Sequence, residues 1–150
     1  DDFKSFRHVP IEEWGKEIDI EWDFDLKNPI YNSFENEEWF PEDVLIIGLV
    51  NLDELFLAIP RVHQLKGDEI WEYRDEDKIN RAILHWKKGG KMTPILISFL
   101  EDHGINAVVM HAGFHRFSVC CLLRLDQIPF FTPISSKEQI EKRLKTVRWI

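Results

Sequence analysis

The 150-residue sequence has only two cysteines, adjacent at Cys120 and Cys121, and it has no internal repeat or low-complexity stretch. Adjacent cysteines cannot form the disulfide framework of a small secreted domain, so we expect a reducing, cytoplasmic location. No apolar run approaches the roughly 20 residues of a membrane span, so no membrane partner is expected. His103 and His111 lack metal-ligand spacing with other residues, which leaves a structural zinc site unsupported.

Acidic residues are in excess, and they are unevenly distributed. The 27 acids and 19 bases give a formal net charge of −8, but residues 1–43 carry −10 and residues 44–150 carry +2. A globally acidic protein is usually a poor nucleic-acid binder. Because residues 44–150 have a net charge of +2, the overall acidity does not exclude nucleic-acid binding by this part of the chain. A chain of this length with 44% hydrophobic and 13% aromatic residues predicts one domain with a sizeable core.

Residues 1–43 combine the acids with many aromatic rings, which a disordered acidic tail would lack. Within them, residues 18–26 alternate apolar with acidic side chains, a pattern that predicts a half-buried strand. The simplest interpretation is an acidic N-terminal layer packed on the domain. The alternative is an acidic surface that binds a basic protein partner or shields a basic groove of the same chain.

Apolar periodicity and turn residues predict the other elements. We expect strands at 44–50, 93–101, 106–111 and 128–133, and helices at 51–59, 79–88, 112–125 and from 135 to the C-terminal region. Asn51 with Glu54 forms a capping-box pattern, and residues 102–104 form a hairpin turn. Residues 61–76 are polar, with a turn at 66–68. These elements predict an α+β fold, a small mixed sheet flanked by helices.

The most informative stretch is the junction of strand 106–111 with the next helix, at Gly113–Arg116. Backbone N–H groups at a helix start lack intrahelical partners, and the helix dipole adds partial positive charge there. Gly113 allows close approach of a ligand, Arg116 can grip phosphate oxygens, and His115 offers a donor or proton-transfer group. The pattern favours phosphate. The structural alternative is that His115 and Arg116 only cap a turn or pair with an acid.

A second polar feature lies on the helix predicted at 79–88. Lys78, Arg81 and His85 follow the spacing i, i+3, i+7, so they share one polar face opposite the apolar stripe.

Residues 44–133 resemble the ParB/sulfiredoxin superfamily in the order of their motifs. The order is Arg74, the helix Ile79–Lys88, Gly90, Pro94–Ile95, the turn Asp102–Gly104, Gly113–Arg116 and Ile128–Pro129. The resemblance implies a ParB/sulfiredoxin-like core at 44–133, between the acidic layer at 1–43 and a basic C-terminal helix within 134–150. It also implies that the Gly113–Arg116 turn holds nucleotide phosphates, with the polar face of Lys78, Arg81 and His85 beside them.

The sequence departs from both best-known branches of the superfamily. Phe114 stands where sulfiredoxins have a nucleophilic cysteine, so sulfinic-acid reduction is not expected. Phe114 and His115 replace the Glu–Arg of the ParB turn that binds CTP. No helix-turn-helix module is present in the 150 residues, so partition-site recognition is not expected.

The chain is most similar to stand-alone members of the superfamily that hydrolyse ATP or cut DNA, among them a plasmid-encoded oncogenicity suppressor. The resemblance then implies an ATPase, with DNase as a further activity, that uses ATP or another nucleotide and Mg²⁺. The catalytic candidates are Glu72, Arg74, His115 and Arg116, and the cofactor-binding candidates are Lys78, Arg81, His85, Gly113, Phe114, His115 and Arg116. Asp75, Glu101 and Asp102 are further acids that could position water or metal. Two alternatives remain open: a nucleotide-switched binding module, and an inhibitor that acts through residues 1–43.

Overall fold

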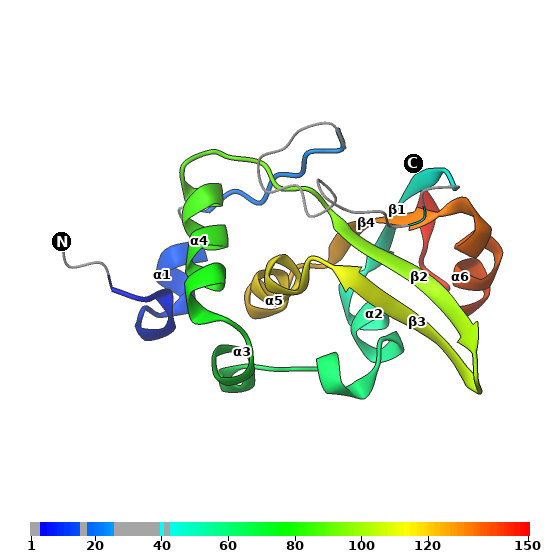
Figure 1. Ribbon diagram of the computed structural model, residues 1–150. Coiled ribbons are helices and arrows are strands. Elements are labelled where there is room, and N and C mark those ends of the chain that lie inside the picture. Colours follow the sequence, from blue (N-terminus) through cyan, green and yellow to red (C-terminus); the bar gives the residue numbers. More distant parts are fainter. Residues whose placement is uncertain (1–3, 16–17, 26–39, 41–42) are drawn as a thin grey trace.

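The structure is a computed structural model that describes residues 4–15, 18–25, 40 and 43–150. At its centre lies a five-stranded mixed sheet with the strand order β3-β2-β4-β1-β5 (Figure 1). The strands are β1 Leu45–Asn51, β2 Ile95–Asp102, β3 Ile105–Ala112, β4 Gln127–Pro133 and β5 Arg148–Trp149. Strand β2 is parallel to β4, and the other neighbours are antiparallel. The first four strands agree with the strands expected from the sequence.

Six α-helices accompany this sheet in the described part of the chain. They are α1 Ile11–Gly15, α2 Leu52–Ala58, α3 Asp68–Tyr73, α4 Glu76–Lys87, α5 Phe114–Leu123 and α6 Lys137–Arg143, with the short 3-10 helices η1 Phe6–His8, η2 Arg61–His63 and η3 Ile134–Ser136. Helices α4 and α5 lie side by side at one end of the sheet, and the β2–β3 hairpin extends away from them (Figure 1). The α+β class is confirmed. Among the described residues, no helix could span a membrane.

The apolar stripe predicted for the helix at 79–88 is buried on α4. Its members Ile79, Ala82, Ile83 and Trp86 are at most 2% exposed. The helix begins after Asp75, whose side chain accepts a hydrogen bond from the backbone N–H of Lys78 (3.2 Å). It ends before Gly89, which has a φ of 83°. The stripe fixes which side of α4 faces the core, so Lys78 and Arg81 are left exposed.

Helix α3, like the short helix α1, was not predicted from the sequence. It lies in residues 61–76, which were expected to be polar with a turn at 66–68. Two adjacent side chains, Ile70 and Trp71, are 1% and 7% exposed and anchor it to the core. One and a half turns with a single apolar pair do not generate a recognisable helical period.

The strand predicted at 18–26 is wrong for residues 18–25, the part that the structure describes. Only an isolated parallel bridge joins Trp22 to Met92. Trp22 packs edge-on against Trp86 of α4, with ring centroids 5.5 Å apart, and the carbonyl of Glu21 accepts a hydrogen bond from the Trp86 indole (2.9 Å). The alternation here reflects side-chain packing and not a continuous ladder.

The last helix is shorter than predicted. Helix α6 ends at Arg143, and the chain turns so that Leu144 is buried from the C-cap position and β5 can pair with β1. Ser136 precedes α6 but its side chain does not cap the helix, because its hydroxyl accepts a hydrogen bond from the backbone N–H of Phe99 (3.0 Å).

The described part of the acidic N-terminal layer packs on the domain. Phe6 and Trp14 are 6% and 1% exposed and belong to the same core as α4 and α5. The backbone N–H of Phe6 donates to Asn80 Oδ1 (2.9 Å), and Arg7 lies 3.5 Å from Glu76. These contacts agree with a packed layer at residues 4–15. Most of residues 26–43 lie outside the described residues.

Glu54 joins α2 to the C-terminal end of the chain. Its carboxylate accepts hydrogen bonds from the backbone N–H groups of Lys145 (2.7 Å) and Thr146 (2.9 Å), and from the Thr146 hydroxyl (2.5 Å). Asn51 Oδ1 accepts a hydrogen bond from the backbone N–H of Glu54 (2.9 Å). The predicted capping box is therefore half formed, with the Glu54 side chain used elsewhere.

We expect Glu54→Gln to lower the free energy of unfolding by about 1–2 kcal/mol at neutral pH, because the amide offers one acceptor oxygen where the carboxylate offers two. Partial burial acts to raise the pKa of Glu54, but hydrogen bonds from Thr146 and Lys145 lower it overall. This stabilisation is therefore complete above the ordinary carboxyl range and is lost as the pH falls through the lowered pKa. Urea unfolding at neutral pH and at about pH 3 tests this.

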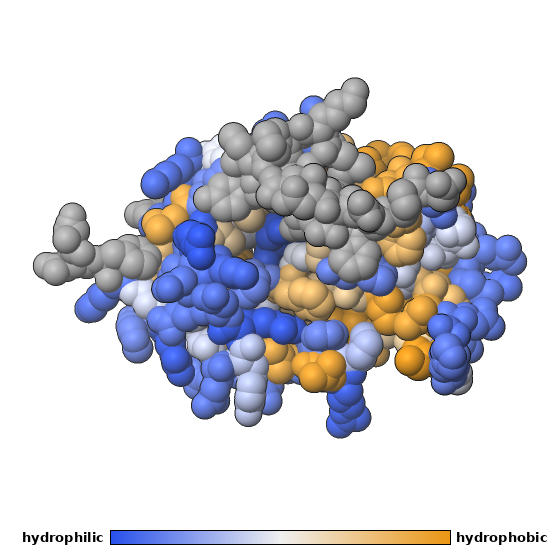
Figure 2. Space-filling model, in the orientation of Figure 1, coloured by the Kyte–Doolittle hydropathy of each residue, from blue (hydrophilic) through white to orange (hydrophobic). Residues whose placement is uncertain are grey.

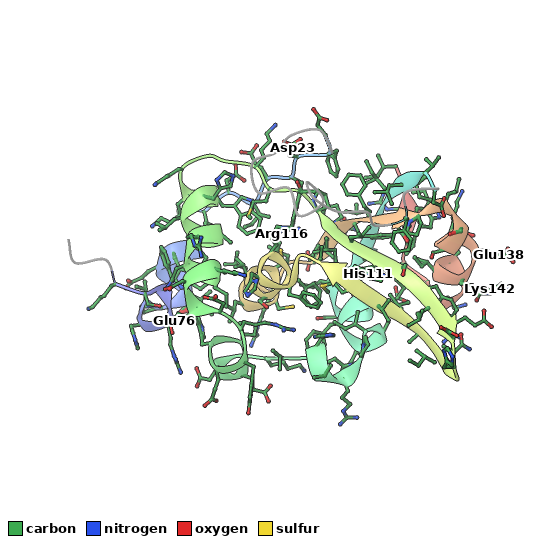
Figure 3. The ribbon with its side chains drawn as sticks, in the orientation of Figure 1. Asp23, Glu76, His111, Arg116, Glu138 and Lys142 are labelled. Carbon is green, nitrogen blue, oxygen red and sulfur yellow. The ribbon has the colours of Figure 1, made fainter. Side chains whose placement is uncertain are left out.

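Glu138→Gln is the matched control. Glu138 forms an exposed i, i+4 pair with Lys142 (3.3 Å; both labelled in Figure 3), which contributes about 0.5 kcal/mol or less. An effect of Glu54→Gln no larger than that of Glu138→Gln would contradict the role of Glu54.

Candidate functional site

Strand β3 meets helix α5 at Gly113, the first residue of the candidate site. Gly113 is the N-cap of α5 and has a left-handed conformation, with φ 98° and ψ 21°. A Cβ atom there would lie 2.7 Å from Cγ2 and 3.0 Å from Cα of Ile95 in β2. The glycine therefore lets the turn lie directly against the sheet. It leaves the N–H groups of the first helical turn without intrahelical partners.

Arg116 is a buried cation with no counter-ion among the residues that the structure describes. It is 7% exposed, and its Nε and Nη2 atoms are buried with no hydrogen-bond partner. Nη2 lies 3.1 Å from the position of a Cβ on Gly113, so the guanidinium faces the start of α5. Burial lowers its pKa to about 10, which leaves it charged at neutral pH. Unsatisfied buried donors are costly, and an anion bound here would satisfy them.

Figure 3 labels Arg116 at α5, between α4 and the end of β3. Figure 2 shows hydrophilic side chains over α4 on the same face of the molecule.

Phe114, the residue after the glycine, lies between an imidazole and a guanidinium. Its ring centroid is 4.7 Å from that of His63 in η2 and 5.0 Å from the Cζ of Arg74. Arg74 Nη2 also donates to His63 Nδ1 (3.0 Å), while Arg74 Nε is buried with no partner. Phe114 therefore fixes the Arg74 side chain next to the turn, as cation–π contacts do.

The hydrogen bonds of His63 and His115 define which ring nitrogen carries the proton. His115 Nε2 accepts a hydrogen bond from the backbone N–H of Asp75 (3.3 Å), and His63 Nδ1 accepts one from Arg74. Backbone amides and guanidinium groups can only donate, so both of these ring nitrogens are unprotonated. The other nitrogen of each neutral ring, Nε2 of His63 and Nδ1 of His115, then carries a hydrogen and is a donor.

Several of the predicted site residues come together at the turn. Gly113, Phe114, His115 and Arg116 form its backbone and first helical turn, and Arg74 contacts Phe114. Lys78 is close enough to His115 for its charge to lower the pKa of that imidazole.

Three of the predicted site residues lie elsewhere. Glu72 is exposed on α3, and Arg81 is exposed on α4. His85 Nε2 donates to the carbonyl of Lys91 (2.8 Å), and its ring lies against Gly90 at the far end of α4. Of the other acids considered, Asp75 adjoins the site, whereas Glu101 and Asp102 are at the exposed end of β2.

His63 is the site residue that the sequence did not reveal. It lies 51 positions before Phe114 and belongs to no motif with it. Only the packing of η2 against the start of α5 brings the two rings together, and no spacing pattern encodes such a contact.

The donor set of the turn does not fit a divalent cation. Mg²⁺ prefers oxygen ligands, especially carboxylates. Asp75 is the carboxylate next to His115, and its Oδ1 accepts from the backbone N–H of Lys78. No group of three or more histidine, cysteine, aspartate or glutamate side chains in the described residues could hold a metal ion.

Hollows in the surface lie away from this turn. One groove of about 590 Å³ lies between α2, α3 and the C-terminal end of α5, lined by residues that include Phe56, Lys66, Cys121 and Arg124. A smaller one, of about 400 Å³, lies between α2, β3 and Arg143. Neither contains an unpartnered buried polar side chain, so the Gly113–Arg116 turn remains the candidate site.

Three partly buried histidines predict how stability depends on pH. Burial lowers the pKa of His63, His111 and His115, and for His115 the charges of Lys78 and Arg74 add to this effect. Each histidine therefore stabilises the fold fully above its ordinary pKa of about 6.5, and that stability is lost as the pH falls towards the folded value.

We therefore expect the melting temperature to fall as the pH is lowered below about 6.5, with each of these histidines adding at most one proton to the uptake on unfolding. Scanning calorimetry between about pH 8 and 5 measures this, and His115→Gln is expected to flatten the curve. His103→Gln, which changes an exposed side chain in the hairpin turn, is the control. A melting temperature independent of pH over this range would contradict the expectation.

Comparison with protein-family models, with curated proteins and with solved structures found no match to this chain.

Proposed function

We propose that the protein binds the phosphate groups of a nucleotide at the Gly113–Arg116 turn. ATP is the nucleotide that we propose. The observation that carries the proposal is Arg116, a cation that is 7% exposed and faces the start of α5. Its Nε and Nη2 have no partner among the described residues. A helix N-terminus and a buried guanidinium together form a site for an anion with several oxygens.

The order of elements supports a ParB/sulfiredoxin-like fold for this site. Helix α4, the β2–β3 hairpin, the glycine turn, α5 and β4 follow one another as the resemblance implies. Two cysteines without a disulfide are compatible with the cytoplasmic location that we propose.

Hydrolysis of the nucleotide, and of DNA as a second substrate, is the enzymatic version of this proposal. Arg74, Lys78 and Arg116 would neutralise charge on the transferred phosphoryl group. Such chemistry also needs a group that positions or deprotonates water, and Asp75 is better placed for this than Glu72, which is exposed on α3.

A nucleotide-switched binding module is the second candidate, and one observation favours it. His63 and His115 each use their unprotonated nitrogen to accept a protein hydrogen bond, so neither offers a free base to a substrate. The site then binds phosphate more readily than it activates water. In this version a protein partner would bind differently to the nucleotide-bound and nucleotide-free forms. The acidic residues of 1–43 could contact that partner.

The test is a thermal-shift panel of ATP, ADP, CTP and GTP on wild type and Arg116→Ala. We expect at least one nucleotide to raise the melting temperature of wild type only, since a ligand that binds the native state stabilises it. Phosphate release and plasmid cleavage then separate the versions: turnover lost in Arg116→Ala supports the enzyme, and binding without turnover supports the module. No shift at millimolar nucleotide would end the proposal.

A further inference from the structure

We infer that the Gly113–Arg116 site takes its polyphosphate free of divalent cation, with nitrogen donors of the protein in the place that Mg²⁺ usually occupies. The inference rests on the proposed function. It states whether the bound polyphosphate carries Mg²⁺ and which groups neutralise its negative charge.

The first argument is the number of donors on the residues of the turn and on the side chains packed around it. Arg116 Nε and Nη2 and Arg74 Nε are buried without partners. The hydrogen bonds described above leave His63 Nε2 and His115 Nδ1 as donors. The unpaired backbone N–H groups at the start of α5 add to them. A chain of phosphates offers more acceptor oxygens, spread over a greater length, than one phosphate, so the site favours such a chain.

The second argument is the sign of the charge. Arg74, Lys78 and Arg116 all lie close enough to His115 that, after burial, their charges lower its pKa, and they outnumber the one opposing charge, that of Asp75. Three cations and a helix N-terminus match the charge of a di- or triphosphate without help from a metal. The same cations repel a divalent ion from this place, since like charges in a partly buried site interact strongly.

The third argument is the absence of suitable oxygen ligands in the described site. Asp75 is the one carboxylate in contact, through its backbone, with His115, and its side chain caps α4. A metal there would have to displace the cap. A cation bound to the ligand in solution would cover the phosphate oxygens that the nitrogen donors need, so Mg²⁺ should compete with the protein.

The experiment is isothermal titration calorimetry with inorganic tripolyphosphate and with ATP, each in EDTA and in excess Mg²⁺ at matched ionic strength. We expect tripolyphosphate and ATP to bind in EDTA, and excess Mg²⁺ to weaken both. We expect Lys78→Ala to weaken binding roughly tenfold, as loss of one charged contact does. Lys88→Ala is the matched control, because Lys88 is an exposed lysine at the other end of α4.

Each outcome decides something different. Binding that requires Mg²⁺ would overturn the inference and leave the proposed function intact. Binding of tripolyphosphate in EDTA without binding of any nucleotide would support the inference and end the proposed function. If neither ligand binds in either condition, both are wrong. Equal losses in Lys78→Ala and Lys88→Ala would show only a general charge effect and would also overturn the inference.

Discussion

Arg116→Met is expected to raise the melting temperature of the ligand-free protein and to remove phosphate binding. Arg116 is buried and charged, and in the described part of the chain its Nε and Nη2 have no partners. Replacing a buried charge with a well-packed apolar side chain is often stabilising, here by about 1–3 kcal/mol. For a chain of this size, each kcal/mol corresponds to roughly 2–4 °C in melting temperature. Loss of two charged hydrogen bonds to a ligand should weaken binding roughly 100-fold.

A higher melting temperature together with weaker phosphate binding would show that Arg116 serves ligand binding and not the stability of the fold. A residue kept for the fold would lower the melting temperature when replaced, whereas a residue kept for a ligand raises it or leaves it unchanged. Arg124→Met is the matched control, since Arg124 is an exposed arginine at the C-cap of the same helix. We expect it to change stability by about 0.5 kcal/mol or less. A fall of several degrees in Arg116→Met, or unchanged binding, would refute the role of Arg116.

The elements that the sequence predicted are those with a long, regular apolar pattern. The stripe on α4 and the apolar run of β1 each extend over enough residues to define a period, and both form the expected element. Helix α3 has only Ile70 and Trp71 to bury, and residues 18–25 are held by ring packing on Trp86. Such short or packing-driven segments depend on contacts distant in sequence, which a local pattern does not contain.

Some residues of the candidate site could likewise be predicted from the sequence, and others could not. Gly113, His115 and Arg116 could be predicted because a strand, a glycine and a helix start are adjacent in sequence. Arg116 could not be known to be unpaired, because that depends on which side chains surround it after folding. The pairing of His63 with Arg74 was equally hidden, and it changes the chemistry expected of the site from proton transfer to hydrogen-bond donation.

The net charge of −8 does not describe the charge around the candidate site, because acids and bases are distributed unevenly over the folded chain. Among the described acids of the N-terminal layer, Glu12 and Glu13 lie in α1, and four more lie in residues 18–25, where Trp22 packs against Trp86 of α4. The cations Arg74, Lys78 and Arg116 converge on the start of α5. Under the proposed function, such a cluster would attract an anion whatever the net charge of the chain, because buried and partly buried charges are weakly screened.

Gly113→Ala is expected to lower the free energy of unfolding by roughly 2–5 kcal/mol, which combines the left-handed conformation with overpacking. The new methyl group would lie 2.7 Å from Ile95 Cγ2 and 3.0 Å from Ile95 Cα. The second contact is to backbone in the middle of the sheet, where β2 is paired to both β3 and β4 and cannot shift cheaply. Arg116 Nη2, at 3.1 Å, would also have to move.

Gly104→Ala separates the cost of the left-handed conformation from the cost of overpacking. Gly104 in the β2–β3 turn has a φ of 85°, and a Cβ there would meet nothing within 4 Å. Only the conformational cost, roughly 1–2 kcal/mol, should then appear. Urea unfolding of both variants gives the difference, and calorimetry with tripolyphosphate on the folded fraction shows whether displacing Arg116 also removes binding. If the two alanine variants lose the same stability, Gly113 is needed for its backbone angle alone, and close approach of the turn to β2 does not hold Arg116 in place.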